Sequence, residues 1–262
     1  MLGSIIGDIV GSRFEFHNIK TKDFSLFGEK CCFTDDTILT CAVAEHLISQ
    51  QPIDITLRKW ALKYKNRTYE NGKIAAFGPG FSQWVETGIS MNSNSNGCVM
   101  RISPLFYANL DAQLVFERVD EITKITHNHA ESFNAVHAYL ETGILIKNNV
   151  EINQIKNEIS AKYQYNLCQS LDEIRPAYNR FYVKCKNSVP QAIICALDAV
   201  SYEDALRNAV SLGGDSDTLA CMAGGLAELR FKIPNDIITN AKKYMDNDII
   251  NLIAQFYNWQ ER

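Results

Sequence analysis

The sequence predicts an all-helical protein, a compact single-domain bundle that covers residues 1–262. Apolar residues recur at spacings of three and four, as in Ile38, Cys41 and Ala42, which is the periodicity of a half-buried helix. The alternation of apolar and polar residues that is typical of strands is almost absent. A chain of 262 residues with 46% hydrophobic and 21% charged residues is large enough to bury one core and has an ordinary globular composition.

The same periodicity places the expected helices in order along the chain. They span residues 36–50, 54–66, 98–108, 112–126, 129–147, 151–163, 189–199, 202–212, 216–230, 234–245 and 247–258. Helix breakers separate them, among them a turn at Gly78-Pro79-Gly80 and the pair Asn148-Asn149. Pro234 is expected at a helix start, where its missing N–H costs nothing.

Charge and hydropathy exclude several classes of protein. The net charge is −4, and the sequence has no basic stripe that would neutralise a row of phosphates, so we expect no binding to nucleic acid. No apolar run reaches the roughly 18 to 20 residues that cross a bilayer, and the N-terminus does not resemble a secretory signal. We therefore expect a cytoplasmic monomer without membrane insertion. Delivery into another cell by a dedicated machine stays open.

The eight cysteines are expected to be reduced thiols that are mostly buried. They form no C-x-x-C pair, and several have apolar neighbours, as Cys195 does. A disulfide framework or a zinc ribbon is the weaker interpretation.

Two acidic clusters far apart in the sequence share one design. The segments Phe33-Thr34-Asp35-Asp36-Thr37 and Gly213-Gly214-Asp215-Ser216-Asp217-Thr218 each place carboxylates and a threonine where a helix begins. Each cluster alone could simply cap its helix. Together in one cleft, the two carboxylate pairs would repel each other unless cations lay between them, and hard cations such as Mg²⁺ prefer oxygen ligands. The pair of clusters therefore predicts a metal site.

Five motifs follow one another in a fixed order along the chain. They are the two acidic clusters together with Gly3-x-x-x-Gly7-Asp8-x-x-Gly11-Ser12-x-x-Glu15, Asn96-Gly97-x-x-Met100-Arg101 and Thr126-His127-x-His129. This set resembles the ADP-ribosylglycohydrolase family. The set covers nearly the whole chain, and its order makes it specific although each motif alone is weak. The resemblance implies a bundle of helices with a binuclear Mg²⁺ or Mn²⁺ centre at the base of a cleft.

The resemblance also assigns roles around the metal centre. The implied ligands of the two cations are Thr34, Asp35, Asp36, Asp215, Asp217 and Thr218. Glu15 matches an acidic residue on a loop that closes over the site, although an exposed loop carboxylate would look the same in sequence. Proton transfer is expected from Glu15 or from one of the aspartates Asp36 and Asp215.

The substrate side of the cleft is expected to include the polar loop before Cys98. Its residues Ser93, Asn94, Ser95, Asn96 and Gly97 are candidates for binding a diphosphate, because backbone amides at a loop–helix junction suit an anion. A polar turn without a ligand is the alternative. The common family pattern has a glycine where this chain has Ser95, which leaves the shape of the loop open.

Two further residues are expected beside the substrate. His127 matches a family histidine next to the ligand, and Phe81 is a candidate for the cleft wall. A zinc site at His127-Asn128-His129 is not expected, because the sequence offers no further histidine or cysteine ligand nearby.

The predicted function is hydrolysis of the bond between C1 of ribose and a protein side chain, with arginine favoured as the acceptor. The partners would be an ADP-ribosylated protein as substrate and ADP-ribose as product, and the metals would orient the ribose and lower the pKa of a bound water. Two alternatives remain, a non-catalytic module that binds ADP-ribose and a two-metal nucleotide phosphohydrolase. Release of free ADP-ribose, rather than of AMP or phosphate, separates the hydrolase from the phosphohydrolase.

Overall fold

The computed structural model describes residues 1–68, 77–90 and 92–260, and in these residues it contains helices and no strand. The predicted all-α fold is confirmed. Ser95 and Lys184 form an isolated β-bridge. The helices are α1 (Leu2–Ser12), α2 (Asp35–Ser49), α3 (Ile53–Tyr64), α4 (Pro79–Thr87), η1 (Asn96–Cys98), η2 (Ser103–Tyr107), α5 (Ala112–His127), α6 (Ala130–Lys147), α7 (Ile152–Tyr163), α8 (Leu171–Ala177), α9 (Cys185–Leu197), α10 (Tyr202–Leu212), α11 (Ser216–Arg230), α12 (Asn235–Ala241), η3 (Lys242–Tyr244) and α13 (Asn247–Gln260).

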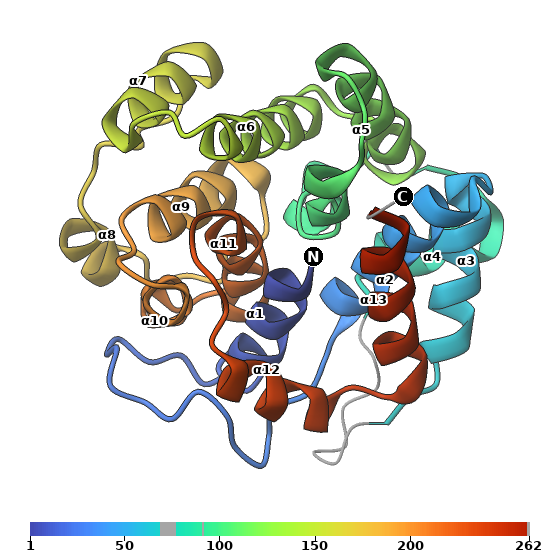
Figure 1. Ribbon diagram of the computed structural model, residues 1–262, viewed down its shortest axis with the longest axis horizontal. Helices are drawn as coiled ribbons and strands as arrows, with labels where there is room; N and C mark the ends of the chain where they lie inside the picture. The colour runs from blue at the N-terminus through green and yellow to red at the C-terminus, as the bar shows by residue number, and fades with distance from the viewer. Residues whose placement is uncertain (69–76, 91, 261–262) are drawn as a thin grey trace.

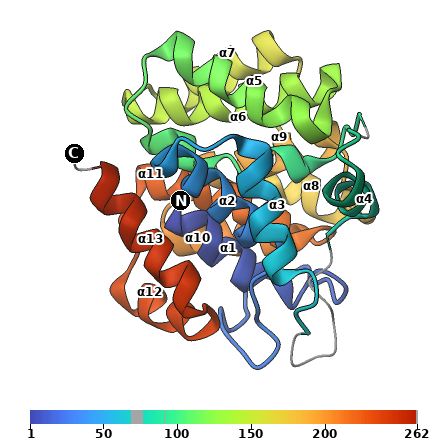
Figure 2. The ribbon, with the colours of Figure 1, turned by 90° about the vertical axis from the view of Figure 1, so that its right-hand side faces the viewer.

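Helices α1 and α11 form the centre of the bundle. Figure 1 shows them near the middle, with α9 and α10 on one side and α2 and α13 on the other. Figure 2 shows α5, α6 and α7 as a layer across one end. Residues 216–227 of α11 are all buried, as expected for a helix that has neighbours on every side.

Glycines allow α1 and α11 to touch backbone to backbone. A Cβ atom added at Gly7 would lie 2.0 Å from the carbonyl oxygen of Ala220, and one added at Gly11 would lie 2.4 Å from that of Ser216. Any larger side chain at these positions would force the two helices apart. The close contact brings the C-terminal end of α1 beside the N-terminal end of α11.

The sequence prediction contained no helix before residue 36, and α1 shows why. Each glycine inside a helix costs about 1 kcal/mol relative to alanine, so a segment with Gly3, Gly7 and Gly11 has a weak intrinsic preference for helix. The same glycines permit the contact with α11, and the packing gained there outweighs the low propensity. Ten of the residues in α1 are buried, from Gly3 to Ser12.

Two other expectations about local structure were wrong, and one further helix was missed. The segment 98–108 is not one α-helix but falls in the two 3₁₀ segments η1 and η2, because Pro104 lacks an N–H and disfavours α geometry at Ser103. The expected turn at Gly78-Pro79-Gly80 is the start of α4, with Pro79 at its first position. Helix α8, which the prediction missed, begins with a capping box between Ser170 and Glu173.

Other expectations are confirmed. Pro234 directly precedes the first residue of α12. Most of the cysteines are buried free thiols, and of the eight only Cys32 and Cys168 have appreciable exposure. Within the described residues, no helix combines the length and the apolar character needed to cross a membrane.

Candidate active site

One cavity of about 430 Å³ lies where the N-terminal ends of α2 and α11 meet the end of α1. The cavity brings together most of the residues that the sequence singles out. The predicted residues among its lining are Glu15, Asp35, Asp36, Phe81, Ser93, Ser95, Asn96, Gly97, His127, Asp215, Asp217 and Thr218. Thr34 and Asn94 are not among the lining residues.

Thr34 caps the start of α2. Its hydroxyl oxygen accepts the N–H of Asp36 at 3.3 Å and donates to the Oδ1 of Asp8 at 2.7 Å. The hydroxyl is therefore used to fix the beginning of the helix and to link it to α1. Its role as a metal ligand stays a prediction.

Asp8 is a site residue to which the sequence analysis gave no role. It is fully buried in α1, and its Oδ2 accepts the backbone N–H groups of Thr34 at 2.9 Å and Thr37 at 3.1 Å as well as the hydroxyl of Thr37. Burial raises the pKa of Asp8 to about 6, although these hydrogen bonds act in the opposite direction. The available signal was a lone carboxylate inside the apolar run from Met1 to Val10, which needs polar partners if it is buried.

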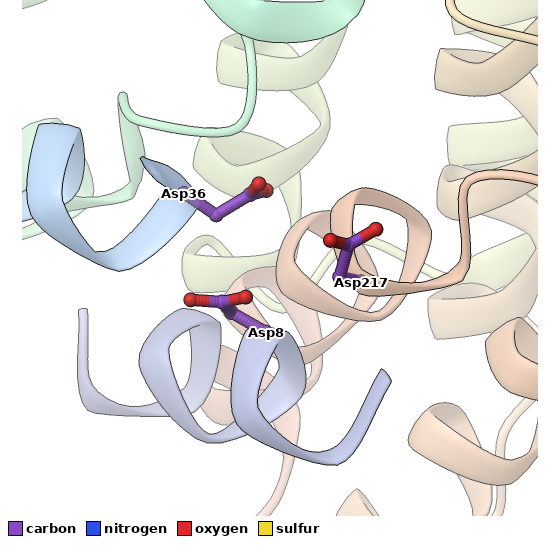
Figure 3. A group of neighbouring side chains, drawn as sticks. All are labelled: Asp8, Asp36 and Asp217. Carbon is purple, nitrogen blue, oxygen red and sulfur yellow. The ribbon is translucent and has the colours of Figure 1, made fainter. Parts of the chain in front are cut away.

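Two groups of three carboxylates share Asp217. Oxygens of Asp8, Asp36 and Asp217 all lie within 4.8 Å of one another, and the same limit holds for Glu15, Asp215 and Asp217. In Figure 3 the side chains of the first group approach one another from three different helices. Asp217 therefore lies between two positions that are each rich in negative charge.

The electrostatics of the cluster favour a bound cation. Burial raises the pKa of Asp36 and of Asp217 well above the usual range, and the neighbouring carboxylates raise it further. The Oδ1 atom of Asp36 is buried and has no hydrogen-bond partner among the described residues. A hard divalent cation would supply the missing partner and neutralise the repulsion, so the donor set fits Mg²⁺ or Mn²⁺.

The turn before α11 has a conformation that only glycine adopts readily. Gly213 and Gly214 have φ values of 75° and 73°, in the left-handed region. The side chain of Asn18 fixes this turn, because its amide donates to the carbonyl of Gly214 at 3.0 Å and its oxygen accepts the N–H of Gly214 at 2.8 Å. Asn18, which the sequence analysis overlooked, thus ties the segment after Glu15 to the start of α11.

Asn96 links the polar loop to the acidic cluster. Its side-chain amide donates to the Oδ2 of Asp215 at 2.6 Å, and this bond acts against the burial that raises the pKa of Asp215. Asn94 lies differently, since its amide donates to Glu131 at 3.2 Å. Binding of substrate by Asn94 stays a prediction without a cavity contact to support it.

His127 is buried at the end of α5 and faces the loop. Its Nε2 lies 3.0 Å from the hydroxyl of Ser95 and its Nδ1 lies 2.7 Å from that of Thr126. Burial, and secondarily the charge of Arg101, lower the pKa of His127 to about 3, so the imidazole is neutral near pH 7. His129 serves elsewhere, as the N-cap of α6.

Two aromatic residues, Phe81 and Phe181, also line the cavity. Phe81 on α4 packs between Phe77 and Trp84, with ring centroids 5.3 and 5.4 Å apart. Phe181, which the sequence analysis did not single out, also lines the cavity and stacks on Phe16 at 5.7 Å. Both partners of this second pair are largely exposed, so it marks the entrance.

Comparisons with known proteins agree with this geometry. The family model described as ADP-ribosylglycohydrolase matches residues 1–260. Two relatives named ADP-ribosylhydrolase ARH3 are each 22% identical to the chain: the one from Danio rerio aligns with 89% of this chain and 82% of its own length, and the one from Bos taurus with 95% and 89%. A solved structure titled ADP-ribosylglycohydrolase-related protein complex has the same fold, with a TM-score of 0.69, 17% identity, and coverage of 99% of this chain and 97% of its own. The match along nearly the whole chain and the acidic cavity lead to the same conclusion: the chain belongs to the ADP-ribosylglycohydrolase family of hydrolases.

Proposed function

We propose that this hydrolase uses two divalent metal ions to remove ADP-ribose from modified protein side chains, with arginine as the favoured acceptor. The observation that carries the proposal is the position of Asp217, shared by two groups of three carboxylates in a cavity that also contains the polar loop. A shared carboxylate between two acidic positions is what a pair of neighbouring cations needs.

The donor set divides naturally between the two cations. One would lie at Asp36 and Asp217, with Asp8 behind them as a hydrogen-bonded anchor, and the other at Glu15, Asp215 and Asp217. The remaining proposed ligands, Thr34, Asp35 and Thr218, belong to the same two helix starts. When bound, Mg²⁺ or Mn²⁺ orients the ribose hydroxyls and makes a coordinated water more acidic.

The two parts of the cavity wall differ in charge and in hydrogen-bonding groups, and this difference suits ADP-ribose. The starts of α2 and α11 supply carboxylates. The loop and the end of α5 supply hydroxyl groups and the neutral His127, and the segment between η1 and η2 supplies the buried Arg101. An anionic diphosphate is favoured at the second part, where donors and a positive charge lie, and the ribose over the metals in the first. Proton transfer during cleavage is then assigned to Glu15, Asp36 or Asp215, which line the acidic part of the cavity.

The favoured acceptor follows from charge at the mouth of the acidic part. Glu15 and Asp35 are half-buried and line the cavity, so the carboxylate oxygens that do not contact a cation would attract the cationic guanidinium group of a modified arginine. Hydrolysis is tested with defined peptides that carry ADP-ribose on arginine or on serine, with the products identified by mass spectrometry. We expect free ADP-ribose, released faster from the arginine peptide. Faster release from serine would overturn the acceptor, AMP would indicate a phosphohydrolase, and binding without turnover a non-catalytic module.

Removal of divalent metal is expected to abolish this hydrolysis. Without cations the carboxylates repel one another, and the ribose has nothing to orient it. Protein treated with EDTA and dialysed should regain activity with Mg²⁺ or Mn²⁺ but not with Zn²⁺, which prefers nitrogen and sulfur ligands. Full turnover by protein that elemental analysis shows to be metal-free would contradict the proposal.

A further inference from the structure

A chain of hydrogen bonds runs from a buried arginine to the polar loop. Arg101 is 0% exposed, and its Nη2 donates to the carbonyl of Ile122 at 3.0 Å and to the hydroxyl of Thr126 at 2.9 Å. From Thr126 the chain continues to His127 and then to Ser95 and Ser93, where the two serine hydroxyl oxygens are 2.9 Å apart. Arg101, Thr126, His127 and both serines line the cavity.

Arg101 fixes which atom donates and which accepts in each hydrogen bond of this series. A guanidinium group can only donate, so the oxygen of Thr126 accepts from Arg101. Within the described part of the protein, the Thr126 hydroxyl otherwise contacts only the Nδ1 of His127, and its hydrogen therefore points to that nitrogen. Other buried threonines of the helices differ, since Thr123 and Thr142 each donate to the carbonyl four residues before them.

The tautomer of His127 follows. With Nδ1 as an acceptor and the ring neutral, the proton must lie on Nε2, which then donates to the hydroxyl oxygen of Ser95. The hydrogen of Ser95 is directed to the oxygen of Ser93, which also accepts the N–H of Ser95 at 3.2 Å. The hydroxyl hydrogen of Ser93 is left to donate into the cavity.

We propose that Arg101 and Thr126 are positioning residues, which act through His127 and Ser95 to make the hydroxyl group of Ser93 a donor toward an anionic oxygen of the ligand. This inference rests on the proposed function, in which that oxygen belongs to the diphosphate of ADP-ribose. The guanidinium group of Arg101 also contributes a positive charge beside the proposed diphosphate position. Its Nε and Nη1 atoms have no hydrogen-bond partner among the described residues.

The test compares Thr126→Val with two other variants of the full-length protein. Thr126→Val keeps the shape of the side chain and removes the hydroxyl, Thr126→Ser restores it, and Thr123→Val is the matched control, a buried hydroxyl on the same helix bonded only to backbone. Long-range ¹H–¹⁵N correlation of His127 in the ligand-free protein should show Nε2–H in the wild type, in Thr126→Ser and in Thr123→Val. Its signals should not change between pH 7.5 and 5, because the pKa is lowered to about 3.

Calorimetry with ADP-ribose provides the second measurement. We expect Thr126→Val to mix the two tautomers and to weaken binding about tenfold, as for the loss of one ordered hydrogen bond to a charged group. Thr126→Ser and Thr123→Val should bind like the wild type. An Nδ1–H tautomer in the wild type, or wild-type affinity in Thr126→Val, would overturn the inference.

Ser95→Ala provides a second test in case Thr126→Val does not fold. Ser95 lies on a half-buried loop, so its replacement by alanine should leave the fold intact. This variant should lose affinity while His127 keeps its Nε2–H, and unchanged affinity would contradict the role of the serine. The proposed function fails by a different result, namely a wild-type protein that does not release ADP-ribose from peptides. The tautomer measurement on the ligand-free protein does not depend on that outcome.

Discussion

Replacing Asp217 by asparagine is expected to abolish hydrolysis and, in the absence of metal, to stabilise the fold. Asp217 belongs to both groups of carboxylates, so its loss weakens both proposed cation positions. Loss of a residue that merely orients a metal ligand costs roughly 10- to 100-fold in activity, and loss of a shared ligand should cost more than about 100-fold. Steady-state rates at saturating and at limiting Mg²⁺ measure this effect.

The stabilisation follows from the direction of the pKa shift. The pKa of Asp217 is higher in the folded protein than in the unfolded chain, so near neutral pH the folded state disfavours the ionised form that the unfolded state adopts. Asparagine removes this penalty, and the metal-free variant should unfold at a higher temperature than the metal-free wild type. The difference should shrink as the pH falls toward 4, where the unfolded chain also takes up the proton.

Asp236→Asn is the matched control. It makes the same chemical change at an exposed position in the first turn of α12, away from the cavity. This variant should keep wild-type hydrolysis and stability. Normal turnover in Asp217→Asn at limiting metal would remove Asp217 from the metal centre.

Gly7→Ala is expected to give the largest loss of stability. The added Cβ atom would lie 2.0 Å from the carbonyl oxygen and 2.5 Å from the carbonyl carbon of Ala220, and these backbone atoms can move away only if α1 and α11 separate. Overpacking of this kind costs about 3 kcal/mol or more. Urea denaturation measures the change in the free energy of unfolding.

Activity should fall together with stability in this variant, because a shift of α1 also moves Asp8, which holds the start of α2. Gly78→Ala is the control for stability. Among the described residues, no atom lies within 4 Å of a Cβ added at Gly78, and the φ of this residue is −54°, so we expect a change below about 0.5 kcal/mol. Equal stabilities of the two variants would show that the glycine contact does not hold the helices together.

The acidic half of the site was predictable because its information is local. Asp35-Asp36 and Asp215-x-Asp217 carry a preference for hard cations in a few adjacent residues, and the caps around them mark helix starts. The roles of Asp8 and Asn18 are not local. Each acts through contacts with residues distant in sequence, and only the packing of α1 against its neighbours creates them.

The helices also differ in whether local sequence was enough to predict them. Strongly periodic segments such as 112–127 and 202–212 were predicted nearly to their ends, because their apolar stripes face the core. Helix α1 was missed because its glycines lower helix propensity, and the contact with α11 that they permit cannot be seen in the local sequence. The split of 98–108 depended on Pro104, whose effect on the preceding residue outweighed the apolar pattern.

The contact between α1 and α11 also determines when the protein can first become active during its synthesis. The hydroxyl of Ser216 donates to the carbonyl of Gly11, 205 residues earlier in the sequence. Helix α1 can therefore complete its packing only after α11 has been synthesised. Contacts between such distant segments form late and slow the folding of a domain. Until α11 has left the ribosome, the nascent chain carries an apolar α1 without its partner and lacks Asp215 and Asp217. Hydrolysis therefore begins only after the chain has been made through α11.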